Sequence, residues 1–113
     1  MSVLRDLDGA IQEFQEVLRR RTNSAEALTN LGLVYMAKGR AELATEMYRN
    51  ALRANPFYAE ANNDLGVALA LTGRREEAIA ELTAAVRLAP DNREYVSNLR
   101  AAQTGAIAPP MER

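Results

Sequence analysis

The chain contains an internal repeat of 34 residues, and this repeat constrains its fold more than any other feature. The tripeptides Asn30-Leu31-Gly32 and Asp64-Leu65-Gly66 place the same Leu-Gly pair 34 positions apart. When the chain is shifted by this period, other positions also coincide: Gly39 with Gly73, Ala44 with Ala78, Ala51 with Ala85, and Pro56 with Pro90. A fixed period of this length is typical of proteins that stack one small structural unit several times.

Within each period the apolar residues follow helical spacing, and glycine or proline interrupts them at the same places. Four helices are predicted from this pattern, over residues 25–38, 41–54, 59–72 and 75–88. A glycine separates the two helices of each period, because glycine readily adopts the left-handed conformation in which helices often end. A proline ends the second helix, since it lacks a backbone N–H donor and restricts the residue before it.

Two further helices are predicted on either side of the complete periods. Residues 5–21 match the second helix of a period, and residues 93–104 match the first helix. Arg100 occupies the position that holds glycine in both complete periods, and a terminal helix with no partner behind it tolerates this change. Gly105 and two prolines follow, so residues 105–113 are expected to form a disordered tail.

The pattern resembles the tetratricopeptide repeat, a helix–turn–helix unit with a few preferred residues. The first repeat, residues 25–58, matches it at Leu28, Leu31, Gly32, Tyr35, Ala44, Tyr48, Ala51 and Pro56. The second, residues 59–92, matches at Leu65, Gly66, Leu69, Ala78, Leu82, Ala85 and Pro90, and departs at Asn62, where a large apolar residue is usual. The resemblance implies an all-α, right-handed α-solenoid. It would be one domain, residues 1–104, with two full repeats and a flanking helix at each end.

The small residues of the pattern have an expected packing role. Gly32 and Gly66 are expected to let the two helices of a hairpin approach closely, and Tyr48 and Leu82 are among the larger residues expected to fill the surrounding space.

The resemblance also implies a concave groove formed by the first helices, where family members usually hold an extended peptide or a helix of a partner. The matching positions of this sequence are Glu26, Thr29, Asn30, Leu33, Met36, Glu60, Asn63, Asp64, Val67, Leu71 and Asn98. Asn30, Asp64 and Asn98 recur with the 34-residue period. An amide there can donate to and accept from a peptide backbone. The alternative is that these three residues are simply solvated polar residues.

The charged residues of this predicted groove are all acidic. Some family members bind carboxylate-ended peptides with basic or amide groups, but Thr29, Leu33 and Glu94 stand at those positions here. An acidic peptide would bring like charges together. The expected partner is therefore a protein or peptide that is neutral or basic and carries an apolar anchor.

The predicted helix over residues 5–21 carries an apolar stripe that one neighbouring hairpin cannot cover completely, formed by Leu4, Leu7, Ile11, Phe14 and Leu18. Exposed apolar stripes mark interaction surfaces. A scaffold that binds a partner is thus one hypothesis. The alternative is a self-associating module that forms a homodimer or larger homo-oligomer through this helix.

The composition argues against other classes of function. The chain has no histidine and no cysteine, and it lacks a Gly-rich phosphate loop, so neither catalysis nor a metal or other cofactor is expected. Its 14 basic and 15 acidic residues give a net charge of −1, which disfavours binding to nucleic acid or to an anionic membrane. No apolar leader or membrane span is apparent, so a soluble, cytoplasmic protein or a piece of a longer one is expected.

Overall fold

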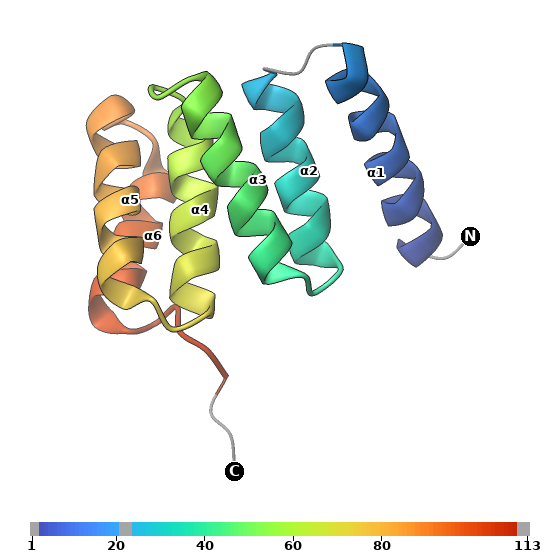
Figure 1. The fold of residues 1–113 in the computed structure, drawn as a ribbon. Coiled ribbons are helices and arrows are strands. Elements are labelled where there is room, and N and C mark those ends of the chain that lie inside the picture. Colours follow the sequence, from blue (N-terminus) through green and yellow to red (C-terminus); the bar gives the residue numbers. More distant parts are fainter. Residues whose placement is uncertain (1–2, 21–23, 111–113) are drawn as a thin grey trace. The chain divides into compact units, whose positions relative to one another are not determined.

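The computed structural model of the 113-residue chain describes residues 3–20 and 24–110, and the side chains of residues 3–5 and 20 fall outside this description. Throughout these ranges the regular structure is helical (Figure 1). The helices are α1 (Val3–Arg20), α2 (Ala25–Ala37), α3 (Ala41–Ala54), α4 (Ala59–Leu71), α5 (Arg75–Leu88) and α6 (Arg93–Thr104). Each helix begins and ends close to its predicted bounds. The chain divides into two compact units, Met1–Pro56 and Phe57–Arg113.

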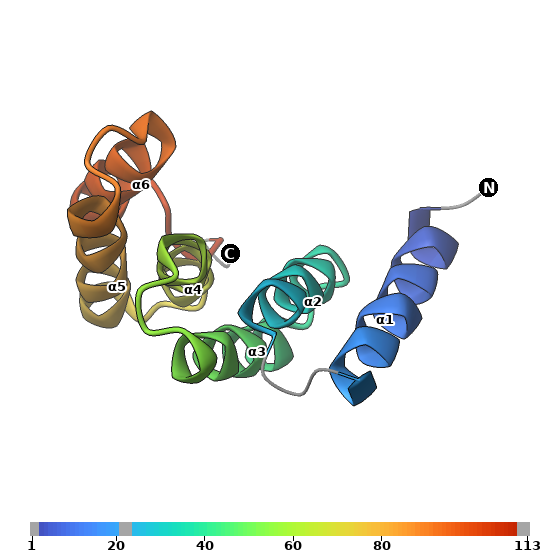
Figure 2. The same ribbon diagram turned by 90° about the horizontal axis from the view of Figure 1, so that it is seen from above.

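In the first unit, α2 and α3 form an antiparallel hairpin, and α1 packs along α2 (Figure 2). The Ser24 hydroxyl caps the start of α2 by accepting a hydrogen bond from the Ala27 amide at 3.1 Å. At the other end of α2, Gly39 adopts a φ of 77°, which places the Arg40 amide 2.8 Å from the Tyr35 carbonyl. Such a bond across a left-handed glycine is a common way for a helix to end. An ion pair between Lys38 and Asp8 joins the end of α2 to α1.

The second unit repeats this hairpin with α4 and α5, and α6 packs against α5 and also contacts α4. Gly73 has a φ of 87°, and the Arg74 amide donates to the Leu69 carbonyl at 2.8 Å, as in the first unit. The Arg75 guanidinium on α5 donates to the Ala102 carbonyl at 3.1 Å and also to the Gln103 carbonyl. These bonds tie the last turn of α6 to α5 through carbonyl groups at the C-terminal end of the helix.

The predicted close approach of paired helices occurs at both glycines. A Cβ atom built on Gly32 would lie 2.7 Å from Cδ1 of Tyr48, and one built on Gly66 would lie 2.5 Å from Cγ of Leu82. Tyr48 and Leu82 are fully buried, so each large residue fills the space that the glycine leaves. Tyr35, another large residue of the repeat pattern, is only half-buried.

Asn62, which departs from the repeat pattern, lies in the interior with 6% of its surface exposed. Its side-chain nitrogen donates to Oε1 of Glu81 on α5 at 3.0 Å, so a polar contact between α4 and α5 occupies the place of an apolar one. Its Oδ1 atom is buried and has no hydrogen-bond partner in the described part of the chain.

After α6 the chain turns at Gly105, whose φ is 81°, and the Ala106 amide donates to the Ala101 carbonyl at 2.7 Å. The remaining residues of the predicted disordered tail, 111–113, lie outside the described residues. None of the helices in the described ranges is both long and apolar enough to cross a bilayer.

Candidate functional site

In the first unit the five predicted groove residues lie on α2, and all but one of them are at least partly exposed. Glu26 and Leu33 are exposed, and Asn30 and Met36 are half-buried. Thr29 is fully buried, and its hydroxyl has no hydrogen-bond partner among the described residues. Thr29 therefore contributes to the interior and does not offer its side chain to a ligand.

In the second unit the predicted residues lie on α4 and α6, and three of them form a hydrogen-bonded chain. The Asn98 side-chain nitrogen on α6 donates to Oδ1 of Asn63 at 3.0 Å. The Asn63 side-chain nitrogen donates in turn to Oδ1 of Asp64 at 3.2 Å. Asn63 is only 2% exposed, so it positions the two flanking side chains rather than facing solvent.

Asp64 stands at the end of this chain of hydrogen bonds, in a setting that disfavours its negative charge. Burial, with smaller contributions from the carboxylates of Glu60 and Glu94, raises the pKa of Asp64 from 3.8 to about 6, although the hydrogen bond from Asn63 opposes the change. No basic side chain among the described residues offsets this rise. The second carboxylate oxygen, Oδ2, is buried and has no hydrogen-bond partner within the described ranges.

Three neighbouring residues, Glu60, Glu94 and Tyr95, surround Asp64, and these four residues are called here the acidic face. Burial raises the pKa of the Tyr95 phenol, and Glu60, Asp64 and Glu94 raise it further. The Glu60 carboxylate accepts a hydrogen bond from the Tyr58 hydroxyl at 2.9 Å. The acidic face therefore combines a desolvated carboxylate with nearby negative charge, an arrangement that attracts a cation. No cluster of three acidic side chains suited to a metal ion occurs in the described part of the chain.

Val67 and Leu71, two of the predicted groove residues, lie further along α4. Val67 is half-buried, and Leu71 is 38% exposed. On α2 of the first unit, Leu33 is 42% exposed. Each unit thus presents apolar surface on the same helix as its acidic groups.

The predicted self-association stripe on α1 is partly covered. Leu7, Ile11, Phe14 and Leu18 are each half-buried, whereas the Leu4 side chain lies outside the described residues. Val17, which the sequence did not single out for this surface, is 40% exposed.

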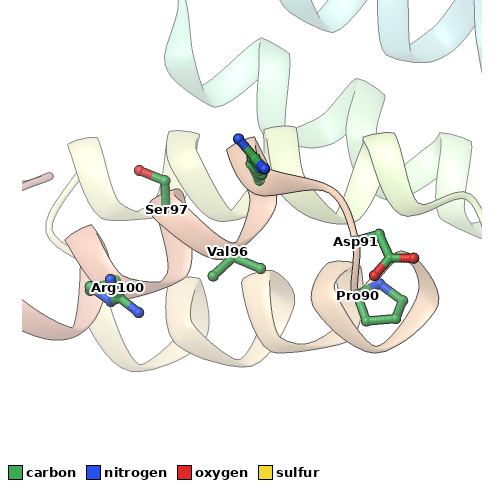
Figure 3. A pocket seen from close by; sticks show the side chains of 6 residues that line it. Pro90, Asp91, Val96, Ser97 and Arg100 are labelled. Atoms are coloured by element: carbon green, nitrogen blue, oxygen red, sulfur yellow. The ribbon is translucent and has the colours of Figure 1, made fainter.

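Two pockets occur that were not predicted from the sequence. One, of about 240 Å³, lies beside α6 and is lined by Pro90, Asp91, Arg93, Val96, Ser97 and Arg100 (Figure 3). The other, of about 230 Å³, lies between α1 and α2 and is lined by Phe14, Val17, Ser24, Glu26, Ala27 and Asn30. The sequence held one signal for the second pocket: Val17 stands where the periods have the small residues Ala51 and Ala85.

The repeat pattern, the paired helices and the glycine contacts agree with one family. The family model described as "Tetratricopeptide repeat" matches residues 3–46 and 32–93. The chain belongs to the tetratricopeptide repeat family. This confirms the resemblance inferred from the sequence and, with the observed helices, the all-α repeat fold. A comparison with curated protein sequences gave no match.

Solved structures with the same fold include one enzyme and two domains in complex with peptides. A mutant of the O-GlcNAc transferase of Thermobaculum terrenum is 31% identical to this tetratricopeptide repeat chain, with a TM-score of 0.82 over 86% of the chain. The match covers only 19% of that enzyme.

The two domains in complex with peptides both come from RPAP3. The first tetratricopeptide repeat domain of Spaghetti (RPAP3), bound to the HSP90 peptide SRMEEVD, is 21% identical, with a TM-score of 0.85 over 91% of this chain and 82% of that one. The second such domain of human RPAP3, in complex with the HSP70 peptide SGPTIEEVD, is also 21% identical, with a TM-score of 0.80 over 86% of this chain and 81% of that one. At 21% identity, these two structural matches are evidence for the fold alone.

Proposed function

We propose that this chain is a protein-interaction scaffold that binds an extended peptide or a helix of a partner on the first helices of its repeats, and that it is not a catalyst. The observation that supports this most directly is the acidic face on α4 and α6, where Asp64 is desolvated and Oδ2 of its carboxylate is unpaired. The proposed contact residues are Glu26, Asn30, Leu33 and Met36 in the first unit and Glu60, Asp64, Val67, Leu71 and Asn98 in the second.

The charge of the proposed partner follows from the acidic face. The two RPAP3 domains hold peptides that end in the acidic sequence EEVD. In this chain, Glu60, Asp64 and Glu94 would meet such a peptide with like charges. A basic group would instead meet opposite charges on this face, and hydrogen bonds to charged groups contribute about 1.5–3 kcal/mol each. The partner is therefore basic or neutral, with an apolar side chain that packs on residues such as Val67 and Leu71.

Two peptides that differ only in charge test this proposal. The acidic probe is SRMEEVD, and the basic probe has lysine in place of its three acidic residues. We expect the basic probe to bind more tightly in isothermal titration calorimetry, and Asp64→Asn to weaken its binding by roughly tenfold, the equivalent of about 1.4 kcal/mol. Asp91→Asn is the matched control, because it removes the same charge from an exposed position of the same unit.

The pH dependence of binding adds a second readout of the same proposal. Because the pKa of Asp64 is raised to about 6, its negative charge is present at pH 7.5 and is lost as the pH falls through 6. The affinity for the basic probe should therefore fall between pH 7.5 and pH 5, and should fall less in Asp64→Asn. Tighter binding of the acidic probe, or equal effects of Asp64→Asn and Asp91→Asn, would contradict the proposal.

A second candidate function is self-association through α1. It is favoured by the incomplete burial of the apolar residues of this helix, since Val17 is 40% exposed and Ile11 and Leu18 remain half-buried. Sedimentation velocity over a hundredfold range of protein concentration tests it. Self-association predicts a sedimentation coefficient that rises with concentration in the wild type and stays constant in Ile11→Lys. A wild-type chain that remains monomeric over the whole range would exclude this function at those concentrations.

A further inference from the structure

The pocket between α1 and α2, called here the α1–α2 pocket, has two chemically different sides. Phe14 and Val17 of α1, with Ala27 of α2, give it an apolar side, and Ser24, Glu26 and Asn30 give it a polar side. Its volume of about 230 Å³ is below the roughly 300–1,000 Å³ of sites that bind small molecules. The size therefore suits a single side chain better than a metabolite.

The apolar side of the pocket exists because α1 is covered less completely than the equivalent helices. Phe14 corresponds in the repeat to Tyr48 of α3 and Leu82 of α5, both of which are fully buried. Phe14 itself is only half-buried, so part of its ring remains available to a ligand. Val17 corresponds to Ala85, which is also fully buried, and the larger valine is 40% exposed beside the pocket.

Among the described residues, the polar side carries one charged group. Of the six described residues that line the pocket, Glu26 is the one with an ionisable side chain, and it is exposed. The Ser24 hydroxyl already accepts a hydrogen bond from the Ala27 amide. This cap, together with Glu26 in the first turn of α2, offsets the positive end of the helix dipole, so that a cation is not repelled from the pocket.

We infer that the α1–α2 pocket receives one lysine or arginine side chain of the partner. The aliphatic stem of that side chain packs on Phe14 and Val17, and its charged end pairs with the Glu26 carboxylate and donates to Oδ1 of Asn30. A long basic side chain fits both sides of the pocket, because it buries its methylene groups while its charged end stays near water. A purely apolar side chain would desolvate Glu26 without pairing it. This inference rests on the proposed function and assigns a second contact for a basic partner.

The test uses small probes and the whole 113-residue chain. Blocked tripeptides Gly-Lys-Gly and Gly-norleucine-Gly are titrated into ¹⁵N-labelled protein, and binding is followed by the backbone amide signals of Glu26, Ala27 and Asn30. Norleucine matches the lysine stem but has no charge. We expect the lysine probe to shift these signals at lower concentration than the norleucine probe. Glu26→Gln should weaken the lysine probe about two- to fivefold, as for an exposed ion pair.

Glu42→Gln is the matched control, because Glu42 is an exposed glutamate in the first turn of α3 in the same unit and does not line the pocket. Phe14→Ala should weaken both probes, since both stems would lose their contact with the ring. The inference is overturned if norleucine binds as well as lysine, if Glu26→Gln and Glu42→Gln have equal effects, or if neither probe shifts the pocket signals.

The same experiment separates this inference from the proposed function. Asp64→Asn should leave the shifts of Glu26, Ala27 and Asn30 unchanged, because Asp64 is not among the residues that line the pocket. If the lysine tripeptide binds the pocket but the basic seven-residue probe gives no binding sensitive to Asp64→Asn, the acidic face fails and the α1–α2 pocket stands. If the seven-residue probe binds through Asp64 and the tripeptide does not bind the pocket, the proposed acidic face stands and the inference about the α1–α2 pocket fails.

Discussion

Gly66 illustrates at the scale of a single residue how a missing side chain shapes the hairpin. A Cβ atom at this position would lie 2.5 Å from Cγ of Leu82, 3.0 Å from its Cδ2 and 3.1 Å from the carbonyl oxygen of Ala78. The leucine could change rotamer only within a packed interior, and the carbonyl oxygen belongs to the backbone of α5. An added methyl group would therefore push α4 and α5 apart.

Overpacking a filled interior usually costs roughly 1–3 kcal/mol, whereas alanine favours a helix over glycine by about 1 kcal/mol. We therefore expect Gly66→Ala to lower the free energy of unfolding by the difference between these two effects, up to about 2 kcal/mol. Urea denaturation followed by circular dichroism measures it.

Gly9→Ala is the control, because Gly9 is an exposed glycine of α1 and a Cβ atom there would meet nothing within 4 Å. This variant should be unchanged or more stable by up to about 1 kcal/mol. If both variants gained stability, the close packing of Gly66 against Leu82 would not be limiting.

Single residues also show which features of the candidate site could not be predicted from the sequence. The groove positions carried over from the family included Thr29 and Asn63, which the structure buries almost completely. Threonine and asparagine are polar enough to occupy an exposed face and small enough to be buried, so their identity does not decide between the two. The hydrogen bond from Asn98 to Asn63 joins residues 35 positions apart, and only tertiary packing could reveal it.

At the scale of the helix, the bounds could be predicted because the residues that end each helix act locally. Gly39 and Gly73 adopt the left-handed conformation, and the same pair of backbone bonds follows each of them. Ser24 and Asn92 cap α2 and α6 through their side chains. Such signals lie within a few residues of the helix end, so one sequence suffices to read them.

The surroundings of a helix are less predictable than its bounds. α1, α3 and α5 occupy the same place in the repeat pattern, and their sequences predict the same apolar face. Ala44, Tyr48 and Ala51 of α3 are fully buried, whereas the equivalent residues of α1 are not. The difference comes from what packs on each helix, which the sequence of the helix itself does not contain. For the same reason, Val17 marks a departure from the repeat pattern in the sequence, but the α1–α2 pocket itself could not be predicted from it.

At the scale of the whole molecule, the structure predicts unequal resistance to local opening. α4 contains eight buried residues, including Leu65 and Leu69, which are each 1% exposed. No described side chain of α1 is buried. Local opening costs least where few side chains are buried, so α1 should open far more often than α4.

We expect amide hydrogen exchange to reveal this difference as a gradient, fastest in α1 and slowest in α4. The measurement is exchange followed by mass spectrometry at low protein concentration, with peptides that separate the helices. Slow exchange in α1 that persists on dilution would contradict the prediction. A rise in concentration that slows exchange in α1 but not in α4 would show that another copy covers Ile11 and Leu18. The gradient depends on burial within one chain, whereas the change with concentration depends on association between chains. The same experiment therefore distinguishes a monomer with an exposed α1 from a chain whose α1 is covered by a second copy.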